Sequence, residues 1–385
     1  MNGSKSVRNL TQGKISSQIL FFAIPVIIGN LLQELYNVVD TLIVGQTLGE
    51  IKLAAVGSTS SLNFFALGFF IGLSAGCSVI TSQHFGANDM ERVKKSVAAH
   101  IIIGVVSAVV LTVSFVLLVN PLLTMLGTTS DTFEYASRYL TIIYLGIPAT
   151  MLYNLTASLL RSVGDSKTPL YLLLFSSVMN VGLDLLFIIV FRWDVSGAAI
   201  ATVIGQSTAA VIVMFKGLKK PPKLSKFGHY IKRIYHLGFP NILMQSAYTF
   251  YIFGLNLILK TFSDQAVTVL GLYYKWQSLV FIPLGAMQTC IVPVISYNYG
   301  AGMFDRCRKT LKDSVLLGTT IMLIGVLAFE LIPTQLLMTF SSDLAVVSIG
   351  TTAFRIIGTS FIPLVTSLIY PVYFQAIGSA FKSSM

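Results

Sequence analysis

The sequence is short of charged residues and of cysteine. Only 11% of its 385 residues are Asp, Glu, Lys or Arg, against about 25% in soluble domains, and the mean hydropathy is +0.78. This shortage excludes an ordinary soluble globular protein. The three cysteines, Cys77, Cys290 and Cys307, lie in or beside apolar segments without CxxC or zinc-ligand spacing. We therefore expect small buried side chains there, with no disulfide framework and no structural metal site.

The sequence contains long segments without charged residues. Residues 53–88, 96–130, 195–215 and 276–304 contain no Asp, Glu, Lys or Arg, and each is long enough to cross a hydrocarbon core about 30 Å thick. The basic amino-terminal segment is followed by about 30 apolar residues rather than a short signal sequence with a cleavage site. We predict an all-α polytopic membrane protein with ten spanning helices, at about 15–45, 54–83, 96–119, 135–160, 169–191, 195–215, 236–259, 266–297, 313–332 and 346–374.

Basic residues are concentrated in alternate loops. With ten helices at these positions, 20 of the 26 Lys and Arg residues lie in the amino-terminal segment and in the loops on the same side of the membrane. The positive-inside rule places this side in the cytoplasm. We therefore predict a multi-pass protein of the inner (plasma) membrane with a cytoplasmic N-terminus. Topology explains the net charge of +11, so we expect no nucleic-acid partner.

The chain contains an internal repeat. Residues 82–95 (SQHFGANDMERVKK) match residues 296–309 (SYNYGAGMFDRCRK) at an offset of 214. Pro25 matches Pro240, and the Ile-Pro pair at 147–148 matches the pair at 362–363, both at an offset of 215. Parallel repeats of this kind are typical of secondary transporters. We predict two parallel-repeat helical lobes, residues 1–215 and 235–385, joined by a basic cytoplasmic linker at 216–234.

Two expectations concern the linker and the number of helices. A basic loop on the cytoplasmic side is most simply a solvated connection, and binding of anionic lipid headgroups is the alternative. Six helices per repeat would place counterparts of residues 169–215 at about 383–430, beyond the last residue of the sequence. We therefore expect ten helices of an original twelve, with helices 11 and 12 missing.

Polar residues line one face of three helices in the first lobe. Residues three or four positions apart lie on the same side of a helix. The polar series of the three helices, in chain order, are Asn30, Gln33, Asn37 and Asp40; then Ser176, Asn180 and Asp184; and finally Thr202 and Gln206. This pattern predicts a polar pocket within the first lobe.

Asp40 and Asp184 are the strongest functional candidates in this pocket. A lone carboxylate at the bilayer centre costs at least about 2.5–3.5 kcal/mol, whereas an amide or hydroxyl stripe can simply join helices. Two neighbouring carboxylates in an apolar setting share one proton or hold a cation. Glu34 lies about 240° around the helix from Asp40, so we expect it to point elsewhere.

These motifs resemble the multidrug and toxic compound extrusion family over essentially the whole chain. The resemblance rests on segments in the first lobe, and on the repeated loop after 82 and 296. The segments are LLQELYNVVDTLIVGQTLG from 31, RSVGDSKTP from 161, MNVGLDLLF from 179 and GAAIATVIGQ from 197. It implies two six-helix lobes that export organic cations in exchange for Na⁺ or H⁺ by alternating access.

The resemblance also implies site residues. The DinF-like branch of the family binds its coupling ion in the first lobe, at positions that correspond here to Asp40, Asn180, Asp184 and Thr202, with Tyr36 beside them. The NorM-like branch has further carboxylates in the second lobe that this chain lacks. We expect the hinge of the first helix at Pro25. The expected substrate cavity comprises Tyr36, Asn37, Gln33, Gln206, Gln245, Tyr248 and Gln288.

The resulting prediction is a monomeric drug and cation antiporter that needs no cofactor other than its coupling ion, Na⁺ or H⁺. Its expected partners are lipophilic organic cations and the lipid bilayer. Two alternatives remain: a lipid-linked oligosaccharide flippase, for which basic residues in mid-span are too few, and a non-transporting membrane module. An enzyme is the weakest candidate, because the sequence offers no nucleophile with a base, metal cluster or phosphate loop.

Overall fold

A computed structural model describes residues 10–217 and 228–379, and these residues form helices and connecting loops without a β-strand. Residues 218–227, which include Pro221 and Pro222 of the predicted linker, lie outside the described part of the chain. The helices, in chain order, are α1 (Ile15–Leu48), α2 (Glu50–Ser58), α3 (Ser60–Gly86), α4 (Met90–Met125), α5 (Ser130–Leu145), α6 (Ile147–Ser162), α7 (Lys167–Asp184), the π-helix η1 (Leu185–Val190), α8 (Asp194–Gly217), α9 (Gly228–Lys260), α10 (Asp264–Gly300), α11 (Phe304–Leu331), α12 (Pro333–Met338), α13 (Leu344–Thr359) and α14 (Phe361–Ala376).

The prediction of an all-helical, polytopic membrane protein is confirmed. In the described part of the chain, eight spans are long and apolar enough to cross a bilayer, and counting each of two bent helix pairs as one span gives up to ten. The pairs α5–α6 and α13–α14 bend by 48° and 47°, where the sequence predicted single helices at 135–160 and 346–374. Pro148 and Pro363 lie in the first turn of the second helix of each pair. Since proline lacks the amide proton of an unbroken helix, each pair bends there.

The sequence repeat recurs as equivalent contacts. The breaks at Gly146 and Ser360 are 214 positions apart. The Ser82 hydroxyl donates to the carbonyl of Ser162 at 3.1 Å, and Ser296, 214 positions later, donates to the carbonyl of Ala376 at 2.9 Å. The two repeats therefore fold into the same local structure.

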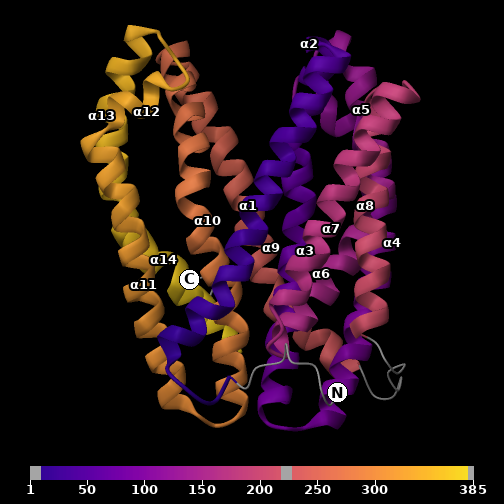
Figure 1. Cartoon of the computed structure of the whole chain (residues 1–385), viewed down its shortest axis with the longest axis vertical. Helices are drawn as coiled ribbons and strands as arrows, with labels where there is room; N and C mark the ends of the chain where they lie inside the picture. Colours follow the sequence, from indigo (N-terminus) through magenta and orange to yellow (C-terminus); the bar gives the residue numbers. More distant parts are fainter. Residues whose placement is uncertain (1–9, 218–227, 380–385) are drawn as a thin grey trace.

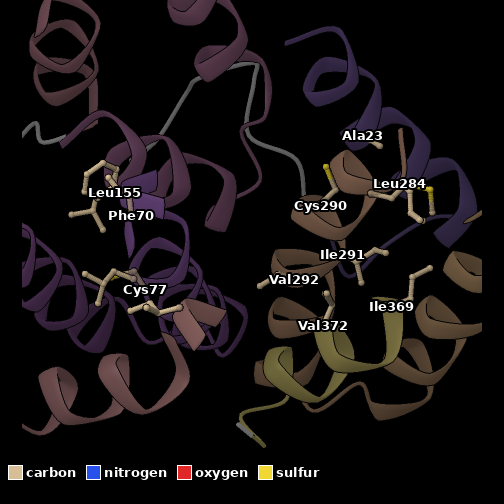
Figure 2. Close-up of a cluster of buried hydrophobic side chains, with 14 of the residues drawn as sticks. Ala23, Phe70, Cys77, Leu155, Leu284, Cys290, Ile291, Val292, Ile369 and Val372 are labelled. Carbon is tan, nitrogen blue, oxygen red and sulfur yellow. The ribbon is translucent and has the colours of Figure 1, made fainter. Parts of the chain in front are cut away.

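The helices form two groups that lie close together at one end and diverge towards the other (Figure 1). The first group contains α3 to α8, and the second contains α10 to α14, with helices packed mainly within each group. Figure 2 shows that the buried apolar side chains gather in two sets. Phe70, Cys77 and Leu155 lie in the first lobe, and Cys290 and Ile369 lie in the second.

Helices α1 and α9 each contact both lobes. The first half of α1 packs on the second lobe, where the Cys290 thiol donates to the carbonyl of Phe22 at 3.4 Å. Arg306 of α11 donates to the carbonyl of Gly13 just before α1. In the equivalent contact, α9 packs on α3, where Gly76 lies against Gly238. Each lobe therefore holds the start of the other lobe's first helix, which the predicted division at 215 did not include.

The two lobes touch most closely at the end where they converge. A Cβ atom added to Gly86 would lie 2.0 Å from the carbonyl oxygen of Tyr297, and one added to Gly300 would lie 1.9 Å from that of Gln83. Gly86 and Gly300 are equivalent in the repeat, as are Gln83 and Tyr297. Only glycine permits such an approach of α3 and α10, so the interface depends on the same residue in both repeats.

Candidate functional site

The centre of the site is a pair of buried carboxylates. Asp40 lies in the second half of α1 and is 9% exposed, and Asp184 is the last residue of α7 and fully buried. Their carboxyl groups lie close enough to interact directly. The structure thus brings together residues 144 positions apart, as the polar helix faces predicted.

Three neutral side chains complete the cluster. The hydroxyl groups of Tyr36 and Thr202 lie 3.1 Å apart, and either can be the donor. The amide nitrogen of Asn180 donates to the Thr202 hydroxyl at 3.2 Å. Tyr36 also lies close to Asp40 and Asp184. All five residues that the family resemblance implies, from helices α1, α7 and α8, therefore form one cluster.

Several oxygen atoms of this cluster have no donor. Among the described residues, one carboxylate oxygen of Asp40, both oxygens of Asp184 and the amide oxygen of Asn180 are buried without a hydrogen-bond partner. Leaving such atoms unpaired costs about 1–3 kcal/mol each, and more when they are charged. A proton or a small cation would satisfy several of these oxygens at once.

Local backbone structure sets the position of Asp184. At this residue the α-helix gives way to the π-helix η1, a feature that is rare and frequent at functional sites. Gly205 of α8 lets the two helices approach closely, because a Cβ atom there would lie 3.2 Å from the Ser176 carbonyl and 3.4 Å from the Asn180 side chain. Asn180 and Asp184 are one helical turn apart and share the face that α8 covers.

Tyr139 of α5 is a member of the site that the sequence did not reveal. Its side chain is 6% exposed, and its phenol lies within electrostatic range of Asp40, Tyr36 and Asp184. Helix α5 also contains Tyr135 and Tyr144, so the presence of a tyrosine did not distinguish position 139. Only the packing of α5 against α8 brings it to the carboxylates.

Other predicted residues of the first lobe lie outside the cluster. Gln33 and Asn37 are exposed on α1, as is Glu34. Gln206 lies one turn beyond Thr202 and accepts a hydrogen bond from the Thr150 hydroxyl of α6. The amide stripe of α1 therefore extends away from the carboxylate pair rather than into it.

The second-lobe candidates do not gather around one point. Gln245 of α9 packs on Gly68 of α3, where the lobes meet. Tyr248 is 47% exposed one turn further along α9. Gln288 of α10 donates to the carbonyl of Leu368 in α14 at 3.0 Å and so joins two helices. Pro25, the predicted hinge, lies inside the continuous helix α1.

The site's chemistry suits a monovalent ion. Oxygen ligands from carboxylates, an amide and hydroxyls are those that hard cations prefer, and a carboxylate pair can instead share a proton. In the part of the chain that the structure describes, no three His, Cys, Asp or Glu side chains are grouped as metal ligands.

Known proteins are similar in sequence to this chain over most of its length. The family model MatE matches residues 25–186 and 240–383, one segment in each lobe. Among curated relatives, the probable multidrug resistance protein YpnP of Bacillus subtilis is 30% identical over 304 residues, which are 76% of this chain and 67% of YpnP. The multidrug export protein MepA of Staphylococcus saprophyticus is 25% identical and covers 94% of this chain and 81% of MepA. The names of these relatives describe multidrug resistance and multidrug export.

Solved structures share the fold. A transporter of the MOP superfamily from Pyrococcus furiosus superposes with a TM-score of 0.90 at 24% identity, covering all of this chain and 87% of that one. A multidrug resistance transporter in an outward-facing conformation gives a TM-score of 0.91 at 24% identity, with the same coverage. The two-lobed arrangement is therefore one already seen in experimental structures.

Proposed function

Because the chain belongs to the multidrug and toxic compound extrusion (MATE) family, we propose that it is a secondary active antiporter for lipophilic organic cations. It exports them in exchange for Na⁺ or H⁺ by alternating access. The multidrug export names of its relatives support the substrate class. The concentration of basic residues on one side of the spans supports a cytoplasmic N-terminus.

One observation carries this proposal: the carboxylates of Asp40 and Asp184 are buried together with oxygens that lack donors. Two unneutralised charges in an apolar lobe repel each other, so an ion or a proton that enters the pair stabilises it. Asn180, Thr202 and Tyr36 supply neutral oxygens around the same point. A structural ion pair would bring a lysine or arginine here, and no described hydrogen bond or salt bridge does so.

Helix α1 connects the ion-binding residue Asp40 to the interface between the lobes. Its second half carries Asp40, and its first half packs on α10 of the second lobe through the carbonyl of Phe22. Ion binding draws the Asp40 segment towards Asp184, and Pro25, between these two contacts, allows the halves to bend separately. Binding in the first lobe then changes the contact between the lobes.

Dye efflux tests the proposal. Cells that express the protein are loaded with ethidium, and efflux is followed with the Na⁺ and pH gradients varied separately. We expect Asp40→Asn to abolish ion-driven efflux and Glu34→Gln, an exposed carboxylate on the same helix, to leave it unchanged. Equal efflux by wild type and Asp40→Asn at equal expression would contradict the role of the carboxylate pair.

A further inference from the structure

Four tyrosines of the second lobe form a cluster. Tyr248 and Tyr251 of α9 stack with ring centroids 6.4 Å apart and planes at 29°. Tyr273 and Tyr274 of α10 have centroids 5.4 Å apart and planes at 50°. This tyrosine cluster is not part of the carboxylate site, since it lies in the other lobe.

The two pairs lie within electrostatic range of each other. Tyr273 is in range of Tyr248, Tyr251 and Tyr274, and Tyr274 is in range of both α9 tyrosines. The Tyr274 hydroxyl oxygen is buried without a hydrogen-bond partner among the described residues. Buried tyrosine hydroxyls normally have a partner, but no hydrogen bond to a described residue fixes the orientation of this ring.

The cluster lies where the lobes separate. Along α9, Gly238 and Ile242 pack on Gly72 of α3, and Gln245 packs on Gly68. Tyr248 follows one turn after Gln245, on the neighbouring side of the helix, and α9 runs from the end where the lobes converge towards the end where they diverge (Figure 1). Tyr248 and Tyr251 remain 47% and 58% exposed, so their rings are accessible from outside the second lobe.

The charges around the cluster favour a cation. The groups that act electrostatically on Tyr273 and Tyr274 are other tyrosines rather than lysines or arginines. Lys275, the next residue along α10, places its amine over the ring of Phe340 instead, at 4.7 Å. Among the described residues, no Lys or Arg is therefore found over these electron-rich ring faces.

We propose that Tyr248, Tyr251, Tyr273 and Tyr274 bind the organic cation through cation–π contacts and ring stacking. The proposal rests on the antiporter function above and assigns its substrate to the second lobe, opposite the ion site. A lipophilic cation with aromatic substituents suits such a surface, because its rings stack on tyrosines while its delocalised charge meets their faces. Ion and drug then occupy different lobes, and their exchange runs through the interface between the lobes.

A pair of probes with the same shape and opposite charge tests this. Binding of tetraphenylphosphonium and of tetraphenylborate is measured on the purified protein and on Tyr251→Leu and Tyr274→Leu. We expect each leucine variant to bind the phosphonium about 5- to 10-fold more weakly and the borate no more weakly, because only the cation gains from the ring faces. Tyr251→Phe and Tyr274→Phe keep the ring and should stay within about 2-fold of wild type.

The controls separate this proposal from the antiporter function. Tyr171→Leu removes a tyrosine that is 64% exposed on α7 of the first lobe and should leave both affinities unchanged, and retained binding of the coupling ion shows that a variant is folded. If wild type and both leucine variants bind the phosphonium with equal affinity, the tyrosine cluster is not the substrate site, but the proposed antiporter function is not contradicted. An equal loss for both probes would also overturn the proposal, since it would show packing without charge selectivity. A wild-type protein that neither binds nor exports the phosphonium would contradict the antiporter itself.

Discussion

The two lobes are copies of one fold, yet their chemistry differs. Their serine contacts, proline bends and interface glycines recur 214 or 215 positions apart. The offset that aligns Pro25 with Pro240 also aligns Tyr36 with Tyr251, but it aligns Asp40 with Leu255. Apart from this tyrosine pair, the shared residues named above are those on which the scaffold depends, whereas the carboxylate proposed to bind the ion is present in the first lobe alone at this aligned position. Duplication has kept the scaffold and allowed each half to specialise.

Neutralising the carboxylates should have the largest effect. Removing one charge from a buried site that holds an ion costs about 3–5 kcal/mol, at least about 100-fold in ion affinity. We expect Asp40→Asn and Asp184→Asn each to abolish ion-driven ethidium efflux. Leu255→Asn at the equivalent position should keep it, and an equal loss in all three variants would remove the distinction between the lobes.

A carboxylate placed in the second lobe should not create a second site. The acidic residues of the described second lobe lie near helix ends or, for Asp313, in the charged first third of α11, so Leu255→Asp would place a lone carboxylate in α9. We expect a loss of stability of about 2.5–3.5 kcal/mol and no rescue of efflux in an Asp40→Asn background. Thermal unfolding and dye efflux measure the two effects, and rescue would contradict the asymmetry.

Alanine substitutions of the two glycines at the lobe interface should lower the stability by similar amounts. Gly86→Ala and Gly300→Ala each force α3 and α10 apart, and overpacking of this kind costs about 1–3 kcal/mol. Gly285→Ala on α10, which meets no atom within 4 Å, should be neutral or stabilising. Melting temperatures in detergent compare the three. Unequal effects of Gly86→Ala and Gly300→Ala would break the symmetry of the scaffold.

Removal of the Tyr36 hydroxyl should weaken the ion site without destroying it. Tyr36→Phe deletes the contact with Thr202 at 3.1 Å, and one such hydrogen bond is worth about 1 kcal/mol, or about 5-fold in ion affinity. Tyr251→Phe, at the equivalent position of the second lobe, should leave ion affinity unchanged. Titration of efflux against Na⁺ concentration and pH measures both. A shift of the same size in both variants would contradict a first-lobe site.

The smallest effect is expected at Gln288. Its amide joins α10 to α14, and an interhelical hydrogen bond in a membrane is worth about 0.6–2 kcal/mol. Gln288→Leu should lower the melting temperature slightly and leave the range of exported dyes unchanged. A changed range would support the cavity position that the sequence predicted instead.

The sequence predicted what depends on spacing along one helix, and not what depends on contacts between helices. Apolar runs gave ten spans, and the i, i+4 series correctly joined Asn180 to Asp184 and excluded Glu34. The start of α1 packs on the second lobe, the start of α9 packs on the first lobe, and Tyr139 lies near the carboxylates. These contacts depend on how helices pack against each other, which the periodicity of a single helix does not reveal. The exposure of Gln33 and Asn37 also depends on packing. They share a helix with Asp40, but the neighbouring helices cover α1 at Asp40 and leave these two side chains exposed.

The most direct test is a count of coupling ions bound by the purified protein. Radioactive sodium measured by equilibrium dialysis, with proton uptake followed in parallel by a pH indicator, gives the number of ions per protein. We predict a single site that disappears in Asp40→Asn and in Asp184→Asn and remains in Leu255→Asn. Undiminished ion binding by the Asp40→Asn, Asp184→Asn double variant would contradict a coupling site in the first lobe.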